Sequence, residues 1–187
     1  MIDVTEFGVH EGISEVILTT ISPEGIPNAA PIGIHMKDGK LFTRIYASKT
    51  LENIKFNKKA VANITDDPVI FVVAALSDIE PDSFYYEDGF PVLKNAGGWI
   101  IFDCRWRNRE NIVELSPFTG KINRRKILPV NRGLNAVIEA TVHATRYVLL
   151  KEQEYLGRIE YYNTIVSKCG GPREKEAMRL LHELIGR

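Results

Sequence analysis

The tripeptide Ser48-Lys49-Thr50 places two hydroxyl groups and a lysine where a strand pattern, Leu41–Tyr46, gives way to a helical pattern, Thr50–Asn57. The first turn of a helix carries N–H groups without intrahelical acceptors and the positive end of the helix dipole, so it favours an anion. A lysine ammonium adds a point charge suited to phosphate. These residue types, in this position, predict a small phosphate-type site.

A simpler role for the same residues stays open. Ser48 or Thr50 can be the N-cap of the helix, because a hydroxyl oxygen accepts a hydrogen bond from an N–H of the first turn. Capping is the commoner use of such a tripeptide. The order of the surrounding elements is what favours the site.

The elements that position the tripeptide are three strands before it and one after its helix. Ile13–Ile21 is a β-branched run typical of a buried strand. Ile26–Met36 is the second strand, and its Pro27 and Pro31 cannot donate to a ladder, so we expect it to be edge-like or bulged there. The third strand is Leu41–Tyr46, and Lys59–Ile64 follows the helix.

The middle of the chain is predicted to continue with strands. Val69–Leu76 and Gly98–Trp106 are apolar runs of strand length. Ser77–Ala96 is predicted to be irregular, and loops of that length are usually functional, so it is a natural lid or interface segment. Arg109–Arg125 is predicted to be a hairpin-like excursion around Ser116–Gly120.

The last third of the chain is predicted to be helical. Apolar residues within 134–145 fit a helix with Asn131 as its N-cap, although strand alternation fits part of that segment. Tyr155, Ile159, Tyr162, Val166 and Cys169 repeat at helical spacing, and Pro172 begins a further helix. We therefore expect an α+β fold, with a barrel domain over residues 1–130 and a helical extension over 131–187 packed on it.

Composition excludes several classes of protein. The formal net charge is zero, which argues against a general nucleic-acid or membrane-surface binder. No apolar run reaches the length of a membrane span, so we expect a cytoplasmic protein. Two cysteines and four scattered histidines do not have metal-ligand spacing, so no metal site is predicted. Cys104 is expected to be a small core residue.

The stretch from Ser14 to Ala75 resembles the opening of FMN-binding split β-barrel proteins, the flavin-reductase-like and pyridoxamine-phosphate-oxidase-like group. Flavin reductases have a Lys-Asp-Thr-Leu-x-Asn-Ile stretch, to which Ser48–Ile54 is similar. The whole chain is most similar to an uncharacterised, mainly archaeal family of this fold. It lacks the Arg-x-Arg-x-Val-Leu-Leu-Lys run of the pyridoxamine-phosphate oxidases, which argues against their substrate.

The resemblance implies FMN as cofactor and assigns residues to it. The phosphate would lie at Ser48, Lys49 and Thr50, within the matched stretch that also contains Asn53. The flavin ring would be flanked by four consecutive residues, Ala30, Pro31, Ile32 and Gly33, with Gly33 permitting close backbone approach. Further implied contacts come from Arg44, on the strand face shared with Tyr46, and from Asn63 at the ring edge.

Three functions are consistent with these residues. The first is an FMN-dependent oxidoreductase, reduced by a nicotinamide or deazaflavin donor, in which the cofactor supplies the chemistry. The second is a flavin-binding or sensing module without turnover, and the third is a barrel without flavin. The resemblance and the aromatic segment Phe84–Phe90 also imply a homodimer with flavin at its interface.

Overall fold

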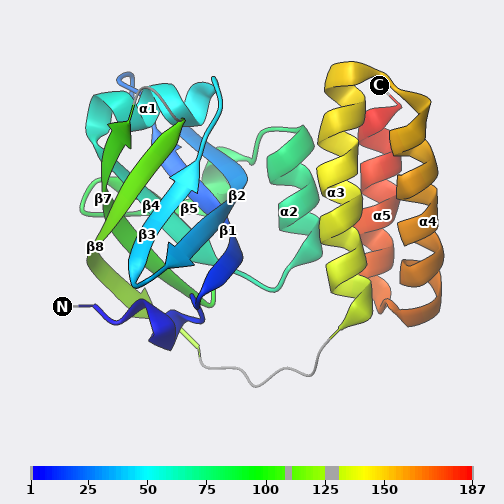
Figure 1. Ribbon diagram of the computed structural model, residues 1–187, viewed down its shortest axis with the longest axis horizontal. Coiled ribbons are helices and arrows are strands. Elements are labelled where there is room, and N and C mark those ends of the chain that lie inside the picture. Colours follow the sequence, from blue (N-terminus) through cyan, green and yellow to red (C-terminus); the bar gives the residue numbers. More distant parts are fainter. Residues whose placement is uncertain (1, 108–110, 125–130, 187) are drawn as a thin grey trace. The chain divides into compact units, whose positions relative to one another are not determined.

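The computed structural model describes residues 2–107, 111–124 and 131–186, which form two compact units (Figure 1). The barrel unit contains the described residues of Met1–Thr65 and Ile79–Arg125, and the helical unit those of Asp66–Asp78 and Lys126–Arg187. The α+β fold class is therefore confirmed. Residues 66–78, which the sequence analysis placed in the barrel domain, belong with the C-terminal helices. The predicted boundary after residue 130 adjoins residues 125–130, which lie outside the described part.

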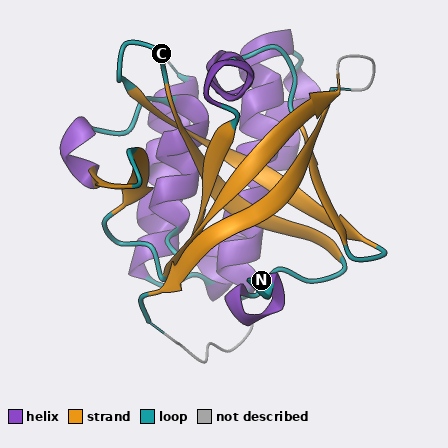
Figure 2. Ribbon diagram, turned by 90° about the vertical axis from the view of Figure 1, so that its left-hand side faces the viewer, coloured by secondary structure: helices purple, strands orange, loops and turns teal. Residues whose placement is uncertain are grey.

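Within the described residues, six strands close into a barrel in the order β1-β2-β3-β8-β7-β4, with every neighbouring pair antiparallel (Figure 2). The strands are β1 (Gly12–Ile21), β2 (Pro27–Lys37), β3 (Lys40–Arg44), β4 (Lys59–Ile64), β7 (Gly98–Arg107) and β8 (Ile112–Ile122). Alternate residues point inward and form the core, which includes Val16, Leu18, Ile34, Ile100 and Phe102. A 3-10 helix, Val4–Phe7, precedes the barrel, and α1 (Lys49–Asn57) lies between β3 and β4.

β8 corrects the predicted excursion over Arg109–Arg125, the ends of which lie outside the described residues. Turn-forming residues suggested a hairpin, yet residues 112–122 form one strand paired along β7. The pairing skips Phe118, because Phe102 faces Pro117 while Ile101 faces Thr119. A β-bulge interrupts the ladder of backbone hydrogen bonds locally. Proline, which has no N–H to donate to the ladder, is tolerated inside a strand at such a bulge.

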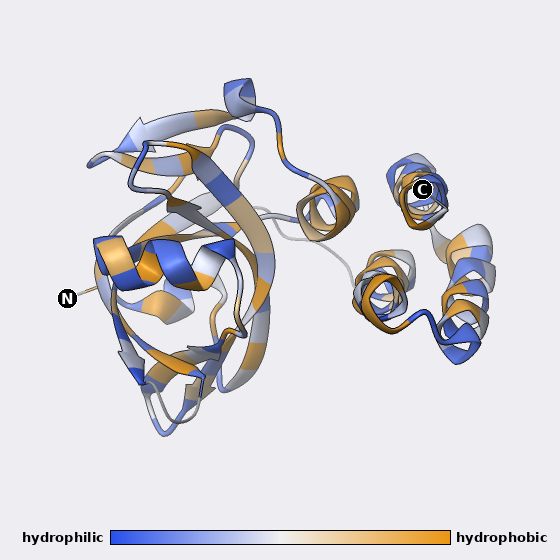
Figure 3. Cartoon of the chain, turned by 90° about the horizontal axis from the view of Figure 1, so that it is seen from above, coloured by the Kyte–Doolittle hydropathy of each residue, from blue (hydrophilic) through white to orange (hydrophobic). Residues whose placement is uncertain are grey.

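α2 (Pro68–Leu76) corrects the strand predicted at Val69–Leu76. Every residue of this segment is apolar, as its colour in Figure 3 shows, and a short continuous apolar run fits a buried helix as well as a buried strand. The decisive signals are at its start. Asp67 accepts a hydrogen bond from the N–H of Val69, and Pro68 occupies the first turn, where a missing N–H costs nothing.

The segment predicted to be irregular, Ser77–Ala96, contains a two-stranded sheet, β5 (Phe84–Glu87) and β6 (Phe90–Leu93), after a 3-10 turn at Pro81–Ser83. Val92 of β6 packs with Val61, Trp99 and Ile101 on the outer side of the barrel strands. The hairpin is also anchored by hydrogen bonds to β1 and β4, described below. It is therefore a fixed part of the barrel unit, which argues against the predicted lid.

The helical unit contains α2 together with α3 (Arg132–Leu150), α4 (Gln153–Cys169) and α5 (Pro172–Ile185). The three predicted C-terminal helices are present, with Asn131 capping α3, which continues to Leu150 beyond the predicted residues 134–145. Their shared apolar core includes Val137, Ala140, Ile159, Val166 and Leu181, against which Val69 and Val72 of α2 pack. No helix among the described residues has both the length and the hydropathy to cross a bilayer.

Candidate functional site

The first turn of α1 has Ser48 as its N-cap. The Ser48 hydroxyl accepts from the N–H of Leu51 at 3.4 Å and donates to the carbonyl of Tyr46 at 3.0 Å. The choice that the sequence left open between Ser48 and Thr50 is thereby settled in favour of Ser48 as the cap. Glu52, the acidic residue of the first turn, forms a 2.8 Å ion pair with Lys55. Pairing reduces the repulsion that this carboxylate would exert on an anion bound at the helix end.

β2 and β3 are paired over only part of their length. Their register runs from Lys37↔Lys40 to Ile34↔Thr43, while β2 pairs with β1 along all of residues 27–36. Among the described strands, residues 27–33 of β2 therefore have β1 as their only partner. We call residues 29–33 of β2 and the facing residues 44–49 the open seam. The expectation that Pro27 and Pro31 make this strand edge-like is confirmed.

Backbone groups along the open seam are exposed to a ligand by the geometry of the strand. The hydroxyl of Thr43 donates to the carbonyl of Gly33 at 2.9 Å, so this carbonyl faces β3. Because successive residues of a strand direct their N–H and C=O groups to alternate sides, the backbone groups of Ala29 and Pro31 face the same way. Edge groups of this kind are available to a ligand with donors and acceptors along its rim.

The open seam ends at a side-chain hydrogen bond. The amide nitrogen of Asn28, at the start of β2, donates to the hydroxyl oxygen of Thr50 at 3.0 Å. Thr50 is only 3% exposed, although it lies in the first turn of α1. β2 and the N-terminus of α1 are thus held together beyond the stretch where the two strands separate.

The structure brings most of the predicted site residues to this seam. Ala30, Pro31, Ile32 and Gly33 lie on its β2 side, with the Ile32 side chain packed against the barrel core. Arg44 ends β3 and is exposed, and Tyr46 is 73% exposed. A Cβ at Gly33 would come within 2.8 Å of the Ile13 side chain. The missing side chain of Gly33 therefore leaves room for Ile13 of β1, and the role of Gly33 in ligand approach stays a prediction.

Asn53 and Asn63, two further residues assigned to the flavin, make hydrogen bonds within the barrel unit. Asn53 is buried, and its amide nitrogen donates to the hydroxyl of Thr20 at 3.0 Å. Asn63 is fully buried, donates to the Ile17 carbonyl and the Thr19 hydroxyl at 3.0 Å each, and accepts from the N–H of Leu93 at 2.8 Å.

Asn63 therefore joins β1 and β4 to β6, and the Thr19 hydroxyl strengthens this junction by donating to the Pro91 carbonyl. The Asn63 amide is thus engaged at both its nitrogen and its oxygen inside the barrel unit, which argues against a ligand contact. The assignment of Asn53 to the ligand stays a prediction.

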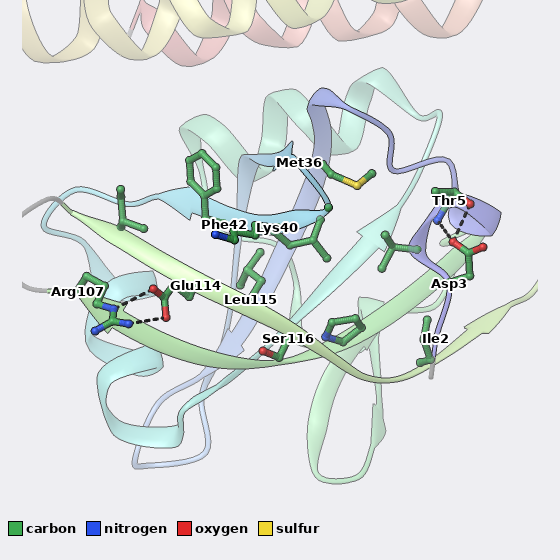
Figure 4. A pocket seen from close by; sticks show the side chains of 15 residues that line it. Ile2, Asp3, Thr5, Met36, Lys40, Phe42, Arg107, Glu114, Leu115 and Ser116 are labelled. Carbon is green, nitrogen blue, oxygen red and sulfur yellow. Dashed lines mark hydrogen bonds and ion pairs between the residues drawn. The ribbon is translucent and has the colours of Figure 1, made fainter.

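A separate groove of about 1130 Å³ lies at the other end of β3, where none of the predicted site residues line it (Figure 4). Its apolar floor includes Met36, Leu41 and Leu115. Glu114 accepts two hydrogen bonds from the Arg107 guanidinium at 2.9 and 3.1 Å, which lower the pKa of that carboxyl. The groove thus combines an apolar floor with a carboxylate that stays ionised, which is a poor arrangement for a general acid.

Other reactive groups are equally unsuited to acid–base or nucleophilic chemistry. Burial raises the pKa of the Cys104 thiol to about 12, so this thiol is protonated and inert at neutral pH. Cys104 is a core residue of the barrel, as predicted. Within the described residues, no group of three or more acidic, histidine or cysteine side chains is placed to hold a metal ion.

Asn28 is the residue that the sequence analysis missed. It precedes the predicted ring-flanking residues by two positions, so it points to the same side of β2 as Ala30. That periodicity was the available signal. Its contact with Thr50 depends on how far β2 and β3 separate, which the sequence pattern does not specify.

Comparison with known proteins agrees with this architecture. A family model described as the N-terminal domain of a protein of unknown function (DUF447) matches residues 14–124, and the model of its C-terminal part matches residues 131–183. An uncharacterised protein of Methanocaldococcus jannaschii, MJ1453, is 28% identical, with 90% of this chain and 96% of that protein aligned.

Two solved structures are informative at different levels. The FMN-bound DUF447 protein MM1853 of Methanosarcina mazei is 47% identical, with a TM-score of 0.91 over 97% of this chain and 100% of that one. The flavin reductase of styrene monooxygenase from Pseudomonas putida S12 is 11% identical, with a TM-score of 0.50 over 68% of this chain and 100% of that one, and shares the fold. The fold is that of the FMN-binding split barrels, as the sequence predicted, and the chain belongs to the DUF447 family.

Proposed function

We propose that this protein binds FMN along the open seam, with the phosphate at the first turn of α1 and the ring beside residues 29–33. The observation that carries the proposal is the coincidence of an unpaired strand edge with a helix N-terminus at its end. A 47% identical relative crystallised with FMN supports the choice of ligand.

The residues at the seam fit the parts of FMN. A phosphate carries close to two negative charges at neutral pH, and it would meet the α1 dipole, the Thr50 hydroxyl and the side chains of Lys49 and Arg44. The ring has hydrogen-bonding groups on one edge, which match the backbone edge at Ala29, Pro31 and Gly33. Tyr46 presents an exposed aromatic face next to the same edge.

We further propose that the protein is an oxidoreductase of the flavin-reductase-like group. FMN, when bound, supplies hydride and electron transfer, and the chain needs only to bind and orient it. This requirement agrees with the inert Cys104 and the ion-paired Glu114. The electron donor would be a nicotinamide or a deazaflavin, and the protein would act as a homodimer with the flavin at its interface.

The alternative is a flavin-binding or sensing module without turnover. The absence of a poised acid or base among the described residues is equally consistent with this function. Reduction of the bound flavin separates the two proposals.

The experiment is a titration of apoprotein with FMN and with riboflavin, followed by flavin fluorescence. A charge-assisted hydrogen bond contributes roughly 1.5–3 kcal/mol, so FMN should bind at least about tenfold more tightly. Equal affinities for FMN and riboflavin would contradict the proposal that the phosphate binds at the first turn of α1. Anaerobic mixing of the holoprotein with each class of donor then tests turnover, and an unreduced flavin with every donor favours the binding module. Sedimentation of the same sample measures the dimer, which a monomer retaining FMN would exclude.

A further inference from the structure

The Thr50 hydroxyl differs from other helical threonine hydroxyls of this protein. Those of Thr141, Thr145 and Thr164 donate to carbonyls of the preceding helical turn, at 2.7, 2.8 and 2.6 Å. The Thr50 oxygen accepts from Asn28, and its own hydrogen has no acceptor among the described residues. A buried donor without an acceptor costs free energy, so this hydrogen is available for an acceptor that the chain does not provide.

Asn28 determines the direction in which the Thr50 hydroxyl can act. A hydroxyl can donate one hydrogen bond and accept two. An amide N–H pointing at the oxygen prevents the Thr50 hydrogen from turning toward Asn28 and leaves it free to point elsewhere. Thr50 is the second residue of α1, so no helical turn precedes it to offer the carbonyl that the other three threonines use. The nearby carbonyl of Tyr46, before the N-cap, accepts from the Ser48 hydroxyl.

We propose that Asn28 is a positioning residue that commits the Thr50 hydroxyl to donate to the phosphate of the bound flavin. The inference rests on the proposed function, because it presupposes that FMN lies with its phosphate at the first turn of α1. It adds a residue that acts through Thr50 without touching the ligand. Asn28 thereby contributes to selectivity for a phosphorylated flavin over an unphosphorylated one.

The test is a double-mutant cycle of Asn28→Ala and Thr50→Val, with Kd measured for FMN and riboflavin by fluorescence titration. The quantity of interest is the ratio of the riboflavin Kd to the FMN Kd. Thr50→Val should lower this ratio about tenfold, the loss of one charge-assisted bond. Asn28→Ala should lower it by about threefold or more, and the double variant should match Thr50→Val alone.

Two further variants control for structural damage. Thr50→Ser keeps the hydroxyl, so adding Asn28→Ala to it should again lower the ratio. Asn57→Ala removes an amide of the same helix, which donates to the Ile21 carbonyl at 2.6 Å. This control should lower the melting temperature and leave the ratio as in the wild type.

Each contrary result has a definite meaning. A loss from Asn28→Ala that persists in full beside Thr50→Val would mean that Asn28 contacts the phosphate itself, and the inference would be wrong. An equal loss of affinity for both flavins would make Asn28 merely structural, and the inference would again be wrong. A wild-type protein without preference for FMN would overturn the proposed function, and the inference with it. A preference that neither variant changes would overturn the inference alone.

Discussion

α1 and α5 are both amphipathic helices with buried apolar residues, and α1 adds buried side-chain hydrogen bonds to the packing of Leu51 and Ile54 in the barrel core. Thr50, Asn53 and Asn57 recur along one face of α1 and bond to Asn28, Thr20 and the Ile21 carbonyl of the barrel. α5 buries Ala177, Met178 and Leu181 in an apolar core, and a polar contact that it makes with another element, the ion pair of Arg173 with Asp67, lies at the surface.

The difference follows from what each helix has to do. Apolar burial is non-directional and tolerates small rotations of a helix, whereas hydrogen bonds fix its orientation. A helix whose first turn is proposed to meet a phosphate needs a defined direction. A helix that completes an apolar core depends mainly on that packing. The predictions below test whether the two helices depend on these forces to the expected degree.

The largest effect is expected from Leu181→Ala in α5. Leu181 is fully buried, and truncating such a leucine removes transfer free energy and leaves a cavity. We expect the free energy of unfolding of the helical unit to fall by about 3 kcal/mol, measured by urea denaturation followed by helical circular dichroism. Both tryptophans of the chain, Trp99 and Trp106, lie in the barrel unit, so their fluorescence follows the other unit separately.

The matched control is Leu149→Ala in α3. Leu149 is 81% exposed, and such a truncation should change stability by less than about 0.5 kcal/mol. Similar losses from the two leucine variants would contradict the assignment of α5 to apolar packing.

A smaller effect is expected from Asn53→Ala in α1. The variant leaves the buried Thr20 hydroxyl without its donor, at a cost of about 1–2 kcal/mol in the unfolding of the barrel unit. Adding Thr20→Val removes the orphaned partner as well, so the double variant should lose less than the sum of the two single ones. Tryptophan fluorescence in urea measures all three. Strict additivity would mean that the two side chains do not support each other.

The smallest expected effect on stability concerns His143, a buried polar residue of the helical unit. The His143 ring stacks between Tyr155 and Tyr162 at 6.0 and 5.8 Å, and its Nδ1 has no hydrogen-bond partner in the described structure. Burial is the main cause that lowers the pKa of this imidazole below 6.5. The charges of Arg158 and Arg146 add to that effect, while those of Glu139 and Glu154 oppose it.

The sign of the pH dependence follows from the lowered pKa. Below pH 6.5 the unfolded chain binds a proton that the folded imidazole resists, so stability falls as the pH falls and levels off below the folded pKa. The contribution is complete above pH 6.5. His143→Phe keeps a ring between the tyrosines and should remove this part of the pH dependence, less than about 1 kcal/mol in urea titrations. His182→Gln is the control. This variant should retain the part of the pH dependence of stability that is due to His143.

Periodicity predicted the elements that the site needs, because strands and amphipathic helices leave repeating patterns. It was wrong for α2, where an unbroken apolar run has no pattern to read, and for β8, where Pro117 and Gly120 suggested a turn. In β8 a bulge accommodates the proline. A Cβ at Gly120 would come 2.8 Å from the Trp99 carbonyl, so the glycine serves close packing of strands and not a turn.

The site was predictable to a similar degree. Ser48, Lys49 and Thr50 could be placed at the start of a helix because a helix start is a local feature of the sequence. The contact between Asn28 and Thr50 spans 22 positions and depends on where two strands stop pairing, which no local pattern specifies. Asn63 was assigned to the ligand because the sequence does not distinguish an asparagine that holds strands together from one that contacts a ligand.

The position of α2 in the chain constrains how the protein can be assembled. α2 is encoded within the barrel sequence, but its apolar surface packs with helices from the last third of the chain. During synthesis α2 leaves the ribosome well before those helices. Its hydrophobic surface is therefore exposed in the meantime and can aggregate or bind a chaperone. A polypeptide cut after residue 124 would keep that surface bare permanently. Cutting the chain once between the two matched family regions therefore yields a barrel fragment that carries an exposed apolar helix. Replacing residues 66–78 of that fragment by a short polar linker would remove the exposed helix.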